Sequence, residues 1–135
     1  MLTENDVVRI LGNYLKAEGY EIIQSLTTSE KGFDIVAKIN GVTLYIEAKG
    51  ETSSKENTKR YGQPFSKNQV KTHVAVAILA SMKVLSKVDH KPKEVAIALP
   101  NNENHRDLIE SIKPTIKKAG IKVFLVGKNS VAKIE

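Results

Sequence analysis

Residues 32–50 read GFDIVAKINGVTLYIEAKG, and this stretch decides the fold. Two runs of alternating apolar residues flank the dipeptide Asn40-Gly41. Asn-Gly between such runs is the strongest short-range signal for a β-hairpin with a two-residue turn. Counting outward from that turn, Asp34 faces Glu47 across the hairpin.

The predicted register places the polar residues of the hairpin at one point. The Asp34/Glu47 pair falls on a non-hydrogen-bonded position, where Cβ atoms lie about 4.5–5.5 Å apart. Lys49 follows two residues after Glu47, so it lies on the same face. The other face is expected to be continuously apolar: Phe33, Ile35, Ala37, Ile39, Val42, Leu44, Ile46 and Ala48.

Two facing carboxylates on a largely buried strand pair require a counter-charge. Lys49 supplies one positive charge, and a divalent cation would supply more. Ligands that are all oxygen, with open coordination positions, suit Mg²⁺ or Mn²⁺. A solvated salt-bridge cluster at an exposed strand end is the alternative that the residues themselves leave open.

The rest of the chain alternates helices with strands. Three early strands joined by short turns predict an antiparallel meander, and a later β-α-β unit predicts a right-handed parallel crossover. The apolar run within the long second helix (VAVAILA) predicts a helix packed in the interior, and Pro114 should kink or interrupt the third helix. We predict a helix after Thr3 up to Gly19, strands at 20–26, 33–39 and 42–49, a loop at 50–65, a helix from Ser66 to about Lys87, a strand at 93–99, a helix at 104–119, and strands at 121–126 and 131–134.

These elements predict one α/β domain over residues 1–135, a mixed central sheet with helices on both faces. The chain has 41% hydrophobic and 27% charged residues, as in an ordinary globular protein. It lacks cysteine, a leader-like start and any apolar run long enough for a membrane span, so we expect a cytoplasmic protein. Its net charge of +6 favours an anionic partner such as nucleic acid, although a merely basic surface explains it equally well.

The hairpin and its context resemble the PD-(D/E)XK nuclease superfamily, which has the restriction-endonuclease-like fold. That family has an α-β-β-β-α-β core, an Asp at the start of the second strand and (D/E)-x-K on the third. Here the matching residues are Asp34 in Gly-Phe-Asp, and Glu47 and Lys49 in Glu-Ala-Lys. Phe33 stands where the family often has Pro. The following loop looks similar to Holliday-junction resolvases and methylation-dependent restriction nucleases.

The resemblance implies a set of site residues. Asp34 and Glu47 would bind Mg²⁺ (Mn²⁺ being the other candidate), with the carbonyl of Ala48 as a third ligand, and Lys49 would orient or deprotonate the attacking water. The family also implies catalytic roles for Gln69, near the start of the second helix, and for Glu4 on the first. Gln69 is equally explained as part of a capping box with Ser66, and Glu4 as an ordinary helix N-terminal charge.

Basic residues flank this expected site. They suit contact with a nucleic-acid backbone, although charges in a loop or a first helical turn are often simply solvated. His73, His90 and His105 have no metal-ligand or triad spacing, so we expect no chemical role for them. The nucleic-acid-binding candidates are Lys55, Lys59, Arg60, Tyr61, Lys67 and Lys71.

The leading hypothesis is a Mg²⁺-dependent DNA endonuclease acting in restriction, repair or junction processing, with RNA still open as a substrate. The alternative is a non-catalytic nucleic-acid-binding or assembly subunit on the same fold. A third hypothesis is a scaffold whose acid pair is only a salt-bridge node. Because one site cuts one strand, cleavage of a duplex predicts a homodimer.

Overall fold

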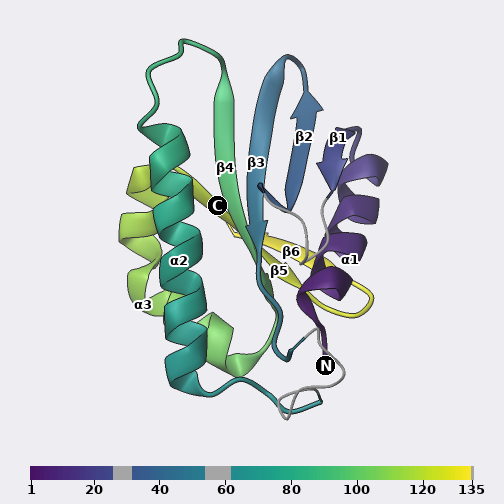
Figure 1. Ribbon diagram of the computed structural model, residues 1–135, viewed down its shortest axis with the longest axis vertical. Coiled ribbons are helices and arrows are strands. Elements are labelled where there is room, and N and C mark those ends of the chain that lie inside the picture. Colours follow the sequence, from purple (N-terminus) through teal and green to yellow (C-terminus); the bar gives the residue numbers. More distant parts are fainter. Residues whose placement is uncertain (26–31, 54–61, 135) are drawn as a thin grey trace.

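The computed structural model describes residues 1–25, 32–53 and 62–134, which form a mixed sheet covered by helices (Figure 1). The strands lie in the order in which they occur in the sequence, from β1 at one edge to β6 at the other. The predicted succession of helices and strands is confirmed. The elements are α1 (Glu4–Ala17), β1 (Glu21–Ser25), β2 (Ile35–Ile39), β3 (Val42–Ala48), α2 (Lys67–Leu85), β4 (Lys93–Pro100), α3 (Glu103–Ala119), β5 (Ile121–Val126) and β6 (Val131–Ile134).

The Asn-Gly turn sets the register of the central hairpin as predicted. Asn40 and Gly41 both have positive φ, 50° and 79°, which is the backbone of a type I′ turn. Ile39 therefore pairs with Val42, and the ladder between β2 and β3 runs without a shift to its last pair. β3, β4 and β5 pair in parallel, and β6 returns antiparallel to β5.

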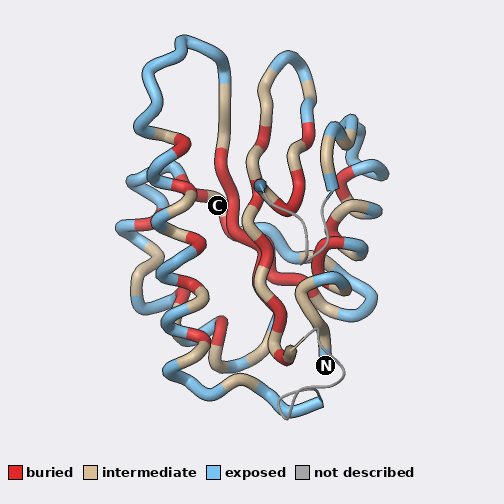
Figure 2. Tube along the Cα trace, in the orientation of Figure 1, coloured by how far each residue is buried: buried red, intermediate tan, exposed pale blue. Residues whose placement is uncertain are grey.

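Helices cover both faces of the sheet, with α1 on one face and α2 and α3 on the other (Figure 1). The buried residues lie on the inner sides of the helices and in the middle strands (Figure 2). One cluster packs the helical stripe of α1, which includes Val7 and Leu11, against Ile46 of β3. The other packs Val74 of α2 and Ile109 of α3 against β4 and β5. Each face of the sheet thus has its own apolar layer.

Side-chain caps begin the helices at the predicted places. Thr3 accepts a hydrogen bond from the N–H of Asp6, whose carboxylate accepts from the N–H of Thr3. Ser66 and Gln69 form the same reciprocal box at the start of α2.

Two expected features of the helices are not found: an interruption at Pro114 and the enclosure of the second helix. α3 continues through Pro114 to Ala119 instead of being interrupted. Pro114 lies on the exposed side of the helix, where water can satisfy the carbonyl that loses its helical donor. α2 is not enclosed, since Val76 and Leu79 are 51% and 54% exposed. The helix packs on the sheet from one side only, so its outward apolar residues stay uncovered within the described part of the chain.

No helix in the described parts of the chain combines the length and the apolar character needed to cross a membrane.

Candidate catalytic and metal-binding site

Three chain segments meet at the carboxyl end of β3. In Figure 1 this strand points toward the N-terminus of the chain, where α1 begins. The N–H of Glu51 donates to the carbonyl of Leu2 at 2.8 Å, which ties the segment after β3 to the segment before α1. Gly50 makes this approach possible, because a Cβ there would lie 2.4 Å from the backbone nitrogen of Glu4. The predicted residue Glu4 is therefore brought beside the end of β3.

Asp34 is held at this junction by the backbone of β3. It is only 8% exposed, and its Oδ2 accepts a hydrogen bond from the N–H of Ala48 at 2.7 Å. In an unbroken ladder that N–H would donate to the carbonyl of Phe33. Here the Phe33 carbonyl accepts instead from Nε2 of Gln24 at 2.9 Å. The Asp34 carboxylate thus replaces a backbone acceptor, and its orientation is fixed by that bond.

The hairpin geometry at this end differs in one respect from the prediction. The ladder ends at the Ile35/Ile46 pair, and Asp34 lies one residue before β2. Phe33, expected on the face opposite to the acids, instead contacts Tyr45 edge-to-face, with ring centroids 5.5 Å apart. It packs with the cluster under α2 and α3. The strict alternation of sides fails here because the Asp34 carboxylate, rather than the Phe33 carbonyl, pairs with β3.

Glu47 lies close enough to Asp34 for the two charges to interact strongly. The pKa of Glu47 is raised to about 7, chiefly by burial and then by the negative charge of Asp34, while Lys49 acts in the opposite direction. Burial also raises the pKa of Asp34, against the lowering effects of the Ala48 N–H and of Lys49. Lys49 continues the parallel pairing beyond β3 through its N–H, which donates to the Ala98 carbonyl at 2.9 Å. The three predicted residues therefore form one electrostatic cluster.

Glu4 belongs to the same cluster. Burial raises its pKa to about 7, and the charge of Asp34 adds to that effect. An ordinary carboxylate on a first helical turn gains about 0.3–1 kcal/mol from the helix dipole. The raised pKa of Glu4 means that its charged form is destabilised by as much as about 3 kcal/mol. Screening by solvent reduces this amount. Burial and the charge of Asp34 thus act on Glu4 in addition to the helix dipole.

The donor set fits a hard divalent cation. Three carboxyl groups, from Glu4, Asp34 and Glu47, lie within reach of the positive charge of Lys49, and burial raises the pKa of each against the lowering effect of that charge. The carbonyl of Ala48 points to the same edge of β3 as its N–H, beyond the last pair of the ladder. Mg²⁺ is commonly held by one or two carboxylates together with water and phosphate oxygens.

The side chains alone provide few ligands. Within residues 1–25, 32–53 and 62–134, no three His, Cys, Asp or Glu side chains converge as ligands of one ion. An ion here would therefore depend on the Asp34/Glu47 pair, the Ala48 carbonyl, and oxygen atoms from water or substrate.

The remaining predicted residues have different positions. Gln69 uses its Oε1 to accept from the N–H of Ser66 at 2.8 Å, so its capping role is established. Lys67 and Lys71 are exposed on the first turns of α2. The candidates in the preceding loop lie outside the described residues: Lys55, Lys59, Arg60 and Tyr61.

His73, for which the sequence predicted no role, lies within electrostatic reach of the cluster. Burial lowers its pKa, and the positive charge of Lys49 lowers it further. Its ring packs edge-to-face on Phe65 with centroids 4.7 Å apart, and its buried Nδ1 has no hydrogen-bond partner in the described structure. The available signal was its spacing, because a residue four positions after Gln69 lies on the same helix face.

Behind His73 lies His105, which is fully buried at the start of α3. Its Nδ1 and the Oδ1 of Asn102 are 2.7 Å apart, and since an amide oxygen only accepts, Nδ1 carries the proton. Burial lowers the pKa of His105 to about 4, and the neighbouring His73 contributes to the shift. The neutral ring is thus part of the core beneath the site.

The strand order, the helices on both faces and the hairpin together define the restriction-endonuclease-like fold, as predicted. A crystal structure of an XisH family protein from Nostoc punctiforme is similar, with a TM-score of 0.56 over 98% of both chains and 17% sequence identity. No family model matches the chain, and no curated protein matches it significantly. The likeness to the XisH family protein is one of fold.

Proposed function

We propose that this protein is a Mg²⁺-dependent DNA endonuclease of the PD-(D/E)XK type, acting in the cytoplasm in restriction, repair or junction processing. The observation that carries the proposal is the meeting of Asp34, Glu47 and Lys49 at the end of β3, with their charges interacting. Perturbed carboxyl groups with a nearby lysine are typical of catalytic sites. A salt-bridge node is less consistent with these residues, because burial outweighs the lowering effect of Lys49 on both carboxyl pKa values.

Each residue has a distinct task in phosphodiester hydrolysis. A bound Mg²⁺ or Mn²⁺ would polarise the phosphoryl oxygen and make its bound water more acidic. Asp34 and Glu47, with the Ala48 carbonyl, would hold that ion, and the Ala48 N–H keeps Asp34 in position. Lys49 would orient the attacking water and offset charge on the phosphate. Glu4 would accept a hydrogen bond from water on the α1 side.

The substrate path would follow the start of α2. Lys67 and Lys71 are exposed there and would contact backbone phosphates, as would the basic loop that precedes them. Gln69 lies between them in the sequence. Its side chain would approach the site once its hydrogen bond with the Ser66 N–H breaks. Since one site cuts one strand, we propose that a homodimer cleaves duplex DNA. RNA is the other candidate substrate.

Cleavage assays on defined substrates test the proposal. Purified protein is incubated with plasmid, branched and single-stranded DNA and with RNA, in Mg²⁺, Mn²⁺ or EDTA. We expect metal-dependent cleavage of DNA that Lys49→Ala abolishes. Lys83→Ala is the matched control, because Lys83 is exposed in the last turn of α2.

The assay also distinguishes the rival functions. DNA binding without cleavage in any metal would support a non-catalytic nucleic-acid-binding or assembly subunit. Absence of both would support a scaffold. Light scattering of the active protein should show a dimer, and a strictly monomeric active species would contradict the homodimer.

A further inference from the structure

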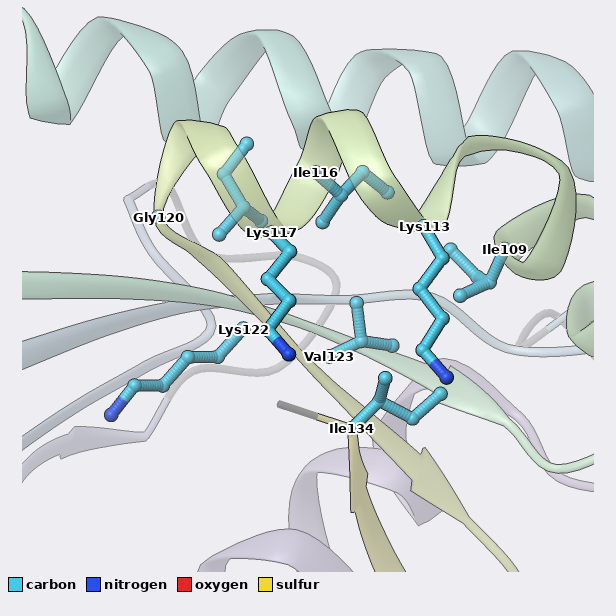
Figure 3. A pocket seen from close by; sticks show the side chains of 9 residues that line it. Ile109, Lys113, Ile116, Lys117, Gly120, Lys122, Val123 and Ile134 are labelled. Carbon is cyan, nitrogen blue, oxygen red and sulfur yellow. The ribbon is translucent and has the colours of Figure 1, made fainter.

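A second site lies between α3 and the far edge of the sheet. A pocket of about 210 Å³ opens between α3 and the strands β5 and β6, beside Gly120 (Figure 3). Val123 in this pocket pairs with Ile97 of β4, which pairs with Glu47 of β3, so the pocket lies two strands away from the acid cluster across the sheet. None of the residues that line the pocket belongs to the acid cluster, so the inference does not depend on the proposed nuclease activity.

The floor of the pocket is apolar and buried. Ile109, Ile116 and Val123 are at most 7% exposed and belong to the core between α3 and the sheet. Ile134, at the end of the edge strand β6, closes one side and is only partly buried. An apolar group that enters here would contact well-ordered aliphatic side chains.

The rim of the pocket is positively charged. Lys113 and Lys117 lie one helical turn apart on α3, and both extend across the opening toward Val123 and Ile134 (Figure 3). Neither has an ion-pair partner among the described residues. Lys122 differs, because it forms an ion pair with Glu94 and points away from the opening. None of the described lining residues is acidic.

The positive charge of the rim and the volume of the pocket together indicate which kind of molecule binds there. Two like charges one turn apart on a helix repel each other, so an anionic partner would relieve an existing unfavourable interaction. Pockets for drug-sized ligands measure about 300–1,000 Å³. This pocket is smaller and matches one large apolar side chain. A nucleic-acid backbone would use the lysines but would leave the apolar floor unoccupied.

The edge strand offers a further attachment point. β6 is the outermost strand of the described sheet, where an extended segment would add along the outer side of the strand. Such a segment would place alternate side chains on the same face as Ile134. A peptide is therefore favoured over a small amphiphile.

We propose that this pocket docks an acidic segment of a partner protein. One aromatic or branched apolar side chain of that segment would fill the isoleucine-lined floor. Carboxylates on either side of this anchor would pair with Lys113 and Lys117.

Methyl NMR with a model peptide tests this docking site. The probe is a capped heptapeptide with one Phe, two Asp on each side of it and Gly at both ends. In protein labelled at isoleucine methyl groups, we expect saturable shifts for Ile109, Ile116 and Ile134. Ile35, under α1 on the other face, serves as the internal control and should not shift.

Two altered peptides separate the anchor from the charges. Replacing Phe by Ala should weaken binding about ten- to hundredfold, as expected for losing one buried apolar side chain. Replacing all Asp by Asn should weaken it about two- to thirtyfold, the range for two exposed ion pairs. The double variant K113Q/K117Q should show the same loss with the original peptide. Lys118→Gln, on the same helix but outside the pocket, should not.

Other outcomes would overturn the proposal. Equal binding of all three peptides, or no saturable shift, would show that the pocket is not a peptide site. Octanoate that binds more tightly than the peptide at the same methyl groups would assign it to a small amphiphile. A DNA duplex that displaces the peptide would make it part of a nucleic-acid surface. K113Q/K117Q should keep the nuclease activity of the unmodified protein, so the two proposals fail separately.

Discussion

Replacing Glu47 by Gln should stabilise the metal-free protein at alkaline pH. The substitution keeps the shape of the side chain and removes its charge. The folded-state pKa of Glu47 is about 7, against an ordinary value of 4.5. The folded protein therefore holds this proton more tightly than the unfolded chain, and its stability falls as the pH rises from 4.5 to 7. Above pH 7 the whole destabilisation is present.

The size of the effect follows from the shift. The difference between 4.5 and about 7 corresponds to as much as about 3 kcal/mol. Asp34 and Glu4 share the cluster, so their own protonation compensates for part of the charge of Glu47. We expect Glu47→Gln to raise the free energy of unfolding by about 1–3 kcal/mol at pH 8. Near pH 4.5 the two proteins should differ little. In a domain of this size the gain corresponds to roughly 4–12 °C in Tm.

Thermal unfolding at pH 4.5 and pH 8 measures this difference, with EDTA or with millimolar Mg²⁺. Mg²⁺ should raise the Tm of the unmodified protein at pH 8 and should have much less effect on Glu47→Gln, because binding to the folded state stabilises it. Glu110→Gln, an exposed carboxylate on α3, is the control. A variant that is equally destabilised at both pH values would refute the electrostatic argument. An identical response of both proteins to Mg²⁺ would refute the metal site.

Three further perturbations address the surroundings of the site. Asp34→Ala should be about 1–3 kcal/mol less stable than Asp34→Asn in urea unfolding, because only the amide can still accept from the buried N–H of Ala48. Equal stabilities of the two variants would mean that this hydrogen bond contributes little. Gly50→Ala should lose about 1–3 kcal/mol through its clash with the backbone at the start of α1, whereas Gly12→Ala, with open space around it, should gain up to about 1 kcal/mol. His105 should make the protein acid-sensitive: the unfolded chain binds a proton near pH 6.5 and the folded one only near pH 4, so about 2–3 kcal/mol is lost between pH 7 and pH 4.5. His105→Gln should lack that part of the acid dependence, and an unchanged pH profile would contradict the assignment.

Local chemistry explains why much of the fold was predictable. The Asn40-Gly41 turn requires two residues with positive φ, and this requirement sets the register of every pair up to Ile35 and Ile46. The capping boxes at Thr3 and Ser66 involve atoms only three residues apart, so they form whatever the distant packing. Asp34 and Glu47 each lie one residue beyond the last pair of this ladder, which brings them near each other.

The sequence pattern did not predict features that depend on competition between distant groups. The strand pairing predicted for Phe33 is missing from the ladder. The Asp34 carboxylate, and not the Phe33 carbonyl, accepts the hydrogen bond of the Ala48 N–H. The exposed face of α2 could not be recognised from composition, since whether Val76 is covered depends on which elements pack beside it.

The sequence by itself therefore determined the hairpin, the helix starts and the pair of acids, because each depends on interactions within a short segment or across one turn. Only the tertiary structure decided that Glu4 joins the pair, since this requires Gly50 to pass against the start of α1. It also placed His73 near Lys49, through the packing of α2 on the sheet. Contacts between segments far apart in the chain depend on the summed packing of whole elements, and no local pattern encodes that sum.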